Sequence, residues 1–240
     1  YMHHVDVQRG MGMEKKAIGA ALRASLPVMA GYIVLGMGFG VLLADKGYSW
    51  LWALLMSATI YAGSMQYAAL DLISGGASLI TCGLMTLMIN ARHFFYGLSM
   101  LDKYQDAGKK KPYLIFALTD ETYSLVCSPA PEGVNTTDYY FWVSLLDQLY
   151  WILGSVLGGL LGPILPFDST GMDFAMTALF VVIFVEQWQS AKSHVPALLG
   201  LGISVACLLL LGPTNFVIPS MILVTLALAA CRGVLEVRPE

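Results

Sequence analysis

Long stretches without a charged residue constrain this chain more than any other feature of its sequence. They cover residues 24–44, 47–70, 72–91, 148–167 and 193–231. A helix needs about 20 mostly apolar residues to cross a bilayer, so the first four stretches can each hold one span and the last can hold two. Apolar residues make up 57% of the chain and charged residues 12%. The sequence therefore predicts a membrane protein and excludes a soluble globular fold and intrinsic disorder.

The segments are uniformly apolar and long, which favours transmembrane helices over a barrel of short alternating strands. We predict an all-α, polytopic helical membrane protein with about seven to eight transmembrane segments, some of them broken or re-entrant. The candidate segments run over residues 25–44, 50–72, 77–100, 113–128, 139–163, 173–189, 194–212 and 214–231.

The chain begins with a polar tail over residues 1–16, part of which is consistent with an expression remnant and none of which has the pattern of a cleaved signal peptide. Residues 17–240 are predicted to form a single transmembrane domain.

Two stretches within this domain show weak internal sequence similarity. The stretch Tyr32–Gly40 shares aromatic, aliphatic and glycine positions with Tyr150–Gly158. This similarity predicts repeats over 17–127 and 139–232, joined near 128–138, as is common in secondary transporters. Chance similarity between glycine-rich helices is the alternative.

The distribution of basic residues conflicts with a simple count of spans. Lys15, Lys16 and Arg23 place the N-terminus in the cytoplasm, and the lysine cluster at 103–111 belongs on the same side. Three apolar segments lie between these two basic regions, whereas an even number of crossings is needed. We therefore expect one of the first three segments not to cross fully, which leaves about seven spans.

Composition also excludes several classes of partner and cofactor. The net charge is −3 and no large basic surface remains, so nucleic acid is not an expected partner. The four cysteines, Cys82, Cys127, Cys207 and Cys231, form neither a CxxC motif nor a close pair, which argues against disulfides and zinc. No motif of a metalloprotease, a serine hydrolase or a nucleotide-binding loop is present. We predict a protein that is not an enzyme and needs no cofactor.

Polar residues inside the apolar segments are the best candidates for a site, because each costs free energy in a bilayer. The first group is Gly63, Ser64, Met65, Gln66 and Tyr67. Glycine lowers helix stability by about 1 kcal/mol relative to alanine, so a break here is plausible. A broken helix frees backbone amides, and the N-terminus of the second half favours a carboxylate. The alternative is a close helix crossing with Gln66 hydrogen-bonded to a neighbour.

The second group ends the third segment. Asn90 and His93 share one helical face, while Arg92 lies near another. Arg92 can bind a carboxylate through two hydrogen bonds, although an arginine near a helix end can also extend to the lipid headgroups. His93 can relay a proton near neutral pH, or can instead cap a helix or bond to a neighbouring helix.

The remaining candidates are acidic. Asp120 and Glu121 are adjacent carboxylates in an apolar segment, which suits reversible proton uptake; an interfacial, ionised position is the alternative. Glu186 is a further candidate for proton coupling, or a solvated helix end. The depth of Asp71 and of Asp147 in the membrane is left open.

Taken together, these residues resemble the AzlC-type permeases, the large subunits of the branched-chain amino acid exporter family. The resemblance covers about residues 17–231 and is specific only as a combination of motifs. The motifs are Leu26-Pro27, Gly38-Phe39-Gly40, Met56-Ser57, Ala62-Gly63-Ser64-Met65-Gln66, Asn90 with Arg92-His93, Tyr96-Gly97, Asp120-Glu121 and the run Phe174–Phe180.

The resemblance implies a multi-pass protein of the bacterial inner membrane that exports valine, leucine, isoleucine and methionine. It also implies a small AzlD-like membrane subunit as partner and the proton gradient as energy source. It does not assign binding residues, so the assignment of Gln66, Arg92 and Asp120 is our own inference.

Our first hypothesis is a secondary transporter of hydrophobic amino acids. Backbone groups freed at Gly63–Gln66 bind the carboxylate and ammonium groups, and Arg92 or Asn90 assists. His93, Asp120 or Glu121 carries a proton. Met65, Tyr67 and Phe94 enclose the aliphatic side chain. The alternatives are a passive channel or a scaffold subunit for a partner protein, and a membrane enzyme that uses Asp120, Glu121 and His93.

Overall fold

A computed structural model describes residues 2–164, the isolated positions 181, 184–185, 188–189 and 191, and residues 193–231. The chain divides into two compact units, residues 1–175 and 176–240, which are described separately. The described residues form helices and no strand, which confirms the all-α class. Three of these helices are long and apolar enough to span a membrane, over Glu14–Asp45, Thr136–Leu161 and Val195–Gly212. The total of seven to eight segments remains a prediction.

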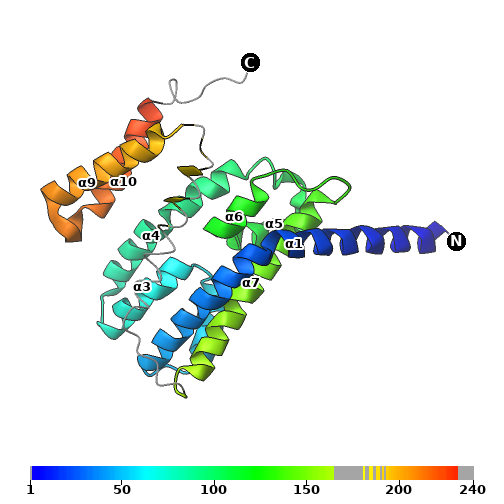
Figure 1. Cartoon of the computed structure of the whole chain (residues 1–240), viewed down its shortest axis with the longest axis horizontal. Helices are drawn as coiled ribbons and strands as arrows, with labels where there is room; N and C mark the ends of the chain where they lie inside the picture. The colour runs from blue at the N-terminus through cyan, green and yellow to red at the C-terminus, as the bar shows by residue number, and fades with distance from the viewer. Residues whose placement is uncertain are drawn as a thin grey trace. The chain divides into compact units, whose positions relative to one another are not determined.

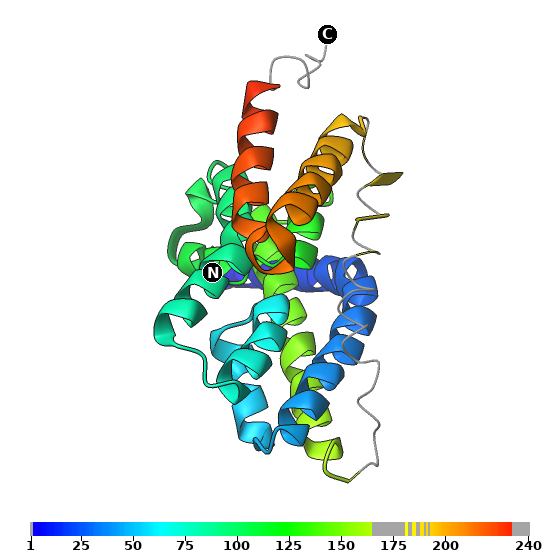
Figure 2. The ribbon, with the colours of Figure 1, turned by 90° about the vertical axis from the view of Figure 1, so that its left-hand side faces the viewer.

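Helices α1 (Met2–Asp45) and α7 (Thr136–Leu161) form the centre of the first unit. They lie side by side in both views (Figure 1, Figure 2) and run in the same direction, since Gly36 faces Gly154 and Gly40 faces Gly158. A side chain at Gly40 would overlap the Ser155 carbonyl, so only glycine permits this approach.

The two stretches that resemble one another in sequence, Tyr32–Gly40 and Tyr150–Gly158, are therefore the surfaces through which α1 and α7 contact each other. The proposed repeats 17–127 and 139–232 remain a prediction, because the second extends over residues outside the described part.

Helices α2 (Trp50–Thr59) and α3 (Gly63–Ser74) form a hairpin, which we call the first hairpin. The predicted break near Gly63 is confirmed and lies at residues 60–62, where Tyr61 adopts a φ of 44°. Trp50 packs against Gly159 near the end of α7, and α3 returns to the same end, where Asp71 pairs with Lys46 at 3.5 Å. The first hairpin therefore enters and leaves at one end of the α1 and α7 pair.

Helix α4 (Leu79–Ser99) leads to the opposite end, where a 3-10 turn, η1 (Gln105–Lys110), follows. Helices α5 (Lys111–Phe116) and α6 (Asp120–Val126) then form the second hairpin. We expected one continuous segment over 113–128, but the helix breaks at residues 117–119.

Both ends of the second hairpin belong to one buried apolar cluster. The members of this cluster include Ala21, Met100, Tyr104, Leu114, Val126 and Tyr139. Because Ala21 lies in the N-terminal half of α1, the second hairpin enters from the end opposite to the first.

The two hairpin tips approach one another inside the unit. The rings of Tyr61 and Phe116 lie 6.3 Å apart. Gln148 of α7 joins the tips, because its Nε2 donates to the Ala58 carbonyl at 3.2 Å and its Oε1 accepts from the Tyr113 hydroxyl at 2.7 Å. This geometry agrees with the expectation that one of the first three apolar segments does not cross fully.

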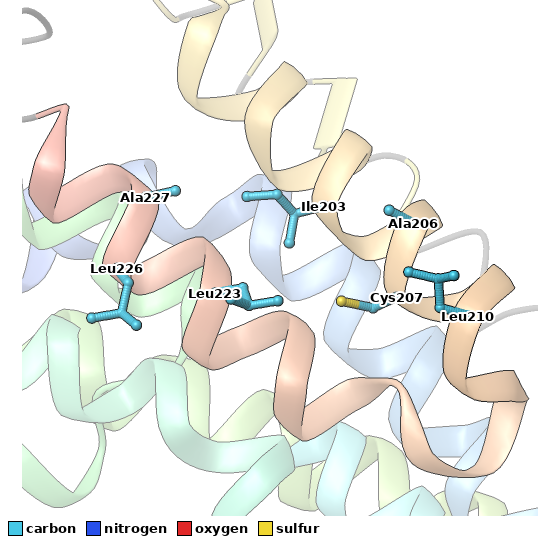
Figure 3. A pocket seen from close by; sticks show the side chains of 7 residues that line it. All are labelled: Ile203, Ala206, Cys207, Leu210, Leu223, Leu226 and Ala227. Carbon is cyan, nitrogen blue, oxygen red and sulfur yellow. The ribbon is translucent and has the colours of Figure 1, made fainter.

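The second unit contains α9 (Val195–Asn215) and α10 (Val217–Ala230), close to the predicted segments 194–212 and 214–231. They form an antiparallel pair, and small and aliphatic side chains such as Ile203, Cys207 and Leu223 line the pocket between them (Figure 3). Most of the predicted segment 173–189, including Glu186, lies outside the described residues.

Candidate functional site

The candidate site lies where the tip of the first hairpin faces α4 and α6. Helix α3 begins at Gly63, and its N-cap residue Ala62 has no side chain that could bond to the first turn. The first amides of a helix have no partner within the helix and carry partial positive charge. The start of α3 thus offers N–H groups suited to an anion.

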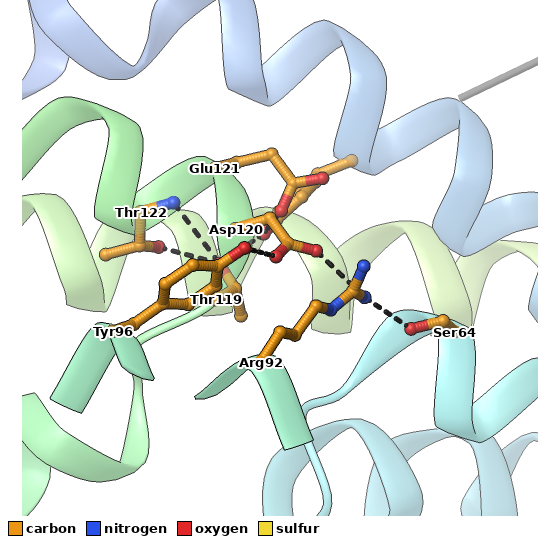
Figure 4. A network of polar contacts seen from close by, with 8 residues as sticks. Ser64, Arg92, Tyr96, Thr119, Asp120, Glu121 and Thr122 are labelled. Carbon is orange, nitrogen blue, oxygen red and sulfur yellow. Dashed lines mark hydrogen bonds and ion pairs between the residues drawn. The ribbon is translucent and has the colours of Figure 1, made fainter. Parts of the chain in front are cut away.

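Arg92 of α4 connects the start of α3 with the start of α6 (Figure 4). Its Nη2 donates to the Ser64 hydroxyl at 2.7 Å and lies 2.9 Å from Asp120 Oδ2. The Tyr96 hydroxyl donates to Asp120 Oδ1 at 2.7 Å. The Arg92 side chain is 30% exposed and that of Asp120 is 14% exposed. The structure thus brings together three predicted site residues, Ser64, Arg92 and Asp120.

Glu121, the neighbour of Asp120, belongs to a second set of contacts. The Tyr32 hydroxyl of α1 donates to Glu121 Oε2 at 2.7 Å and lies 2.6 Å from the Thr119 hydroxyl. Thr119 donates to Thr122 at 3.0 Å, and Thr122 donates to Asp147 Oδ2 at 2.8 Å. A continuous series of hydroxyl groups therefore connects Glu121 of the second hairpin with Asp147 of α7.

Gln66 is fully buried and bonded within the protein. Its Oε1 accepts from the Trp151 indole at 2.9 Å, and its Nε2 donates to the Ser57 hydroxyl at 3.1 Å. Ser57 in turn donates to Ser155 at 2.8 Å. These bonds hold the two arms of the first hairpin against α7, which matches the alternative interpretation of Gln66 as a residue bonded to neighbouring helices.

The other predicted residues of α3 contribute packing around the first turn. A side-chain carbon at Gly63 would lie 3.0 Å from the Trp151 ring. Met65 and Tyr67 are buried, and the Tyr67 hydroxyl donates to the Leu35 carbonyl at 2.6 Å. Tyr67 also contacts Phe39 edge to face at 5.9 Å. The start of α3 therefore rests on an aromatic surface.

The remaining predicted residues of α4 differ in environment. Asn90 has a buried Oδ1 without a hydrogen-bond partner. The His93 ring lies 5.9 Å from the Tyr96 ring, in an edge-to-face contact. Phe94 is 71% exposed, so in this structure it does not enclose a site. Glu186, as noted above, lies outside the described residues.

Sequence reasoning missed several residues of this region. Tyr32, Thr119, Thr122 and Asp147 were not assigned to the site, although Asp147 interrupts a strongly apolar segment. A carboxylate at such a position is costly unless it has a role, and this signal could have identified Asp147. Among the described residues, no group of three His, Cys, Asp or Glu side chains is placed to hold a metal ion.

Two broken helices that meet beside long apolar helices, with buried polar side chains at their tips, are typical of membrane transport proteins. Residues 27–165 match the family model described as AzlC protein, and the chain is 42% identical to an AzlC protein over 228 residues. The chain therefore belongs to the AzlC family.

The relative just mentioned is the branched-chain amino acid transport protein AzlC of Bacillus subtilis, and the match covers 93% of this chain and 90% of that protein. An uncharacterized membrane protein of Helicobacter pylori is 45% identical, with 92% and 97% covered. The inner membrane protein YgaZ of Escherichia coli is 27% identical, with 70% and 72% covered. No solved structure matches the chain.

Proposed function

We propose that this chain is a secondary transporter that exports branched-chain amino acids, and methionine, across the bacterial inner membrane. The observation that carries the proposal is the convergence of Arg92 on the uncapped start of α3, where its guanidinium bonds to Ser64. The name of the Bacillus subtilis relative supports the substrate class.

In the proposed complex, the substrate carboxylate binds the first amides of α3, beside Arg92. An arginine and a helix N-terminus both favour a carboxylate, and together they position it from two sides. The substrate ammonium group is placed toward Asp120 and the Oδ1 of Asn90, which are both acceptors. The aliphatic side chain lies against Met65 and the aromatic residues beneath α3.

Gln66 takes a positioning role in this proposal. Both polar atoms of its side chain already have partners in Trp151 and Ser57, and the side chain is fully buried. Loss of these bonds would leave buried polar groups unpaired, at a cost of about 1–3 kcal/mol each. Gln66 is therefore assigned to holding the helix break open.

Counterflow in proteoliposomes tests whether the chain is a carrier. Purified protein is reconstituted with unlabelled leucine inside, and labelled leucine is added outside. A carrier exchanges the two, so transient accumulation of label is expected. Steady equilibration without stimulation by internal leucine would instead identify a passive channel, and no flux at all would favour a scaffold role.

Two matched variants test the site. Arg92→Gln removes a positive charge at the start of α3, whereas Arg23→Gln removes one from the exposed surface of α1, where Arg23 bonds only to the Gly19 carbonyl of its own helix. The expected result is a loss of leucine exchange in Arg92→Gln only. Leucinamide, which lacks the carboxylate, is expected not to compete with leucine. Equal exchange in both variants would overturn the assignment of Arg92.

The direction of transport, its coupling to protons and the need for a partner subunit require separate experiments. Inside-out vesicles with an imposed proton gradient report whether leucine moves out of the cytoplasmic compartment together with proton movement. Expression with and without a small AzlD-like subunit reports whether the partner is needed for folding, which changes the amount of extracted protein, or for transport, which changes flux alone.

A further inference from the structure

Two carboxylates, Glu121 and Asp147, lie at the ends of an uninterrupted series of three hydroxyl groups. The series runs from Glu121 through Tyr32, Thr119 and Thr122 to Asp147, with oxygen–oxygen distances of 2.7, 2.6, 3.0 and 2.8 Å. Each distance lies in the range of a hydrogen bond between oxygen atoms. The series spans three elements, α1, the second hairpin and α7.

Counting hydrogens shows that this series is one proton short when both carboxylates are ionised. It contains four oxygen–oxygen links but only three hydroxyl groups, each with one hydrogen. If Tyr32 donates to Glu121 and Thr122 donates to Asp147, one hydrogen remains, on Thr119. It can fill the 2.6 Å link to Tyr32 or the 3.0 Å link to Thr122, but not both. In either arrangement two hydroxyl oxygen atoms lie in contact without a hydrogen bond between them.

One additional proton completes all four links. With the proton on Glu121, its carboxyl group donates to Tyr32, and each hydroxyl donates to the next oxygen until Thr122 donates to Asp147. With the proton on Asp147, every donor direction is reversed. The two forms differ by a shift of each hydrogen along its own link, in which one O–H bond breaks and one forms at each step.

The charges around the series favour such a proton. Asp147 is fully buried, its Oδ1 has no hydrogen-bond partner, and it is in none of the ion pairs among the described residues. Burial of an unpaired carboxylate is costly. The ionisable groups that face the series are Tyr61, Tyr113, Tyr139, Tyr96, Asp120 and Arg92. Arg92 is the one cation among these described groups, and it is paired with Asp120.

We propose that Glu121 and Asp147 share one proton, which moves between them through the hydroxyl groups of Tyr32, Thr119 and Thr122. Glu121 adjoins Asp120, the partner of Arg92 at the candidate substrate site, whereas Asp147 lies inside α7. The series thus connects the substrate site with a buried acid. The link between this proton and transport rests on the proposed function, but the sharing of the proton does not.

Infrared spectroscopy tests the shared proton without any transport measurement. A protonated carboxyl group has a carbonyl stretch distinct from that of a carboxylate, and the wild-type protein at neutral pH is expected to show it. Asp147→Asn and Glu121→Gln should each abolish this band, because the new amide supplies the fourth hydrogen and leaves the other carboxylate ionised. The same reasoning predicts that both variants fold. Absence of the band from the wild type, or its persistence in either variant, would overturn the proposal.

A transport measurement tests whether the proton moves along the series of hydroxyl groups. Tyr32→Phe interrupts the series but keeps the ring that packs against Trp151 at 5.5 Å. We expect the ratio of gradient-driven leucine accumulation to leucine exchange to fall by at least about tenfold, as for the loss of a positioned proton-transfer group. Ser124→Ala removes a hydroxyl of α6 that bonds only to the Glu121 carbonyl and should leave the ratio unchanged. An unchanged ratio in Tyr32→Phe would overturn the pathway. If neither the wild-type protein nor any variant transports leucine, the proposed function fails. The infrared result alone then decides whether Glu121 and Asp147 share a proton.

Discussion

Arg92 and Asp120 form an ion pair with an N–O distance of 2.9 Å, although 27 residues and an intervening 3-10 turn separate them in the chain. The pair fastens α4 to the tip of the second hairpin, while the same guanidinium bonds to Ser64 of the first hairpin. A single side chain therefore connects both broken helices. Movement of either hairpin must change the contacts of Arg92.

The first prediction concerns the coupling between these two residues. Arg92→Ala removes the ion-pair partner of Asp120, which keeps its bond from Tyr96. Asp120→Ala removes the ion-pair partner of the guanidinium, which keeps its bond to Ser64. Each change is expected to cost about 1–3 kcal/mol of folding free energy, because a partly buried polar group loses its partner. The double variant should lose less than the sum of the single losses, as interacting residues do. Melting temperatures in detergent measure the difference, and strictly additive losses would show that the pair is not a stabilising contact.

The second prediction concerns the glycine contact between α1 and α7. Gly40→Ala places a methyl group against the Ser155 carbonyl, so the helices must separate and the yield of monodisperse protein should fall sharply. Gly31→Ala is the matched control on the same helix, because nothing lies within 4 Å of its added carbon. That control should be neutral or stabilising by up to about 1 kcal/mol, from the higher helix propensity of alanine. Similar behaviour of both variants in size-exclusion chromatography would contradict the close packing.

The third prediction separates a structural from a binding role for Gln66. Gln66→Ala removes the partner of the Trp151 indole and one of the two partners of the Ser57 hydroxyl. It also leaves a cavity, and together these losses should cost several kcal/mol, on the order of 2–5. Ser64→Ala removes one exchangeable contact of Arg92 and should cost much less. Thermal unfolding compares the two variants. A normal melting temperature for Gln66→Ala with complete loss of leucine binding would restore the direct binding role.

The sequence predicted the first hairpin better than the second. Gly63 weakens the helix locally, and the break indeed falls just before it, at residues 60–62. No glycine or proline marks the break at residues 117–119, so the apolar pattern of 113–128 reads as one helix. The available signal was Thr119 followed by acidic residues, which is the chemistry of a helix start, and the Thr119 side chain does accept from the Thr122 amide at 3.2 Å.

The hydrogen bonds and ion pairs of the candidate site could not be predicted from the periodicity of the sequence. Ser64, Arg92 and Asp120 could be proposed separately, because each is costly in an apolar segment. Their meeting, and the bond from Thr122 to Asp147, depend on how α4, α6 and α7 pack. Tyr32 carries no such signal, since a tyrosine in an apolar helix usually reads as packing. Its role follows only from its distances to Thr119 and Glu121.

The last prediction tests the two hairpins by their exposed connections. In a variant without the four native cysteines, single cysteines are placed at Ser49, at Ala77 and at Gln105. Ser49 precedes the first hairpin and Ala77 follows it, so both should react with an impermeant thiol reagent from the same side of the membrane. Gln105 lies in the turn before the second hairpin, at the end of the unit near Ala21, and should react from the other side, together with an N-terminal reference cysteine at Glu14. This result would also explain why the basic residues at 15–23 and 103–111 share a side although three apolar segments separate them. Labelling of the cysteine at position 77 from the side opposite to the cysteine at position 49 would mean that residues 50–74 cross the membrane completely.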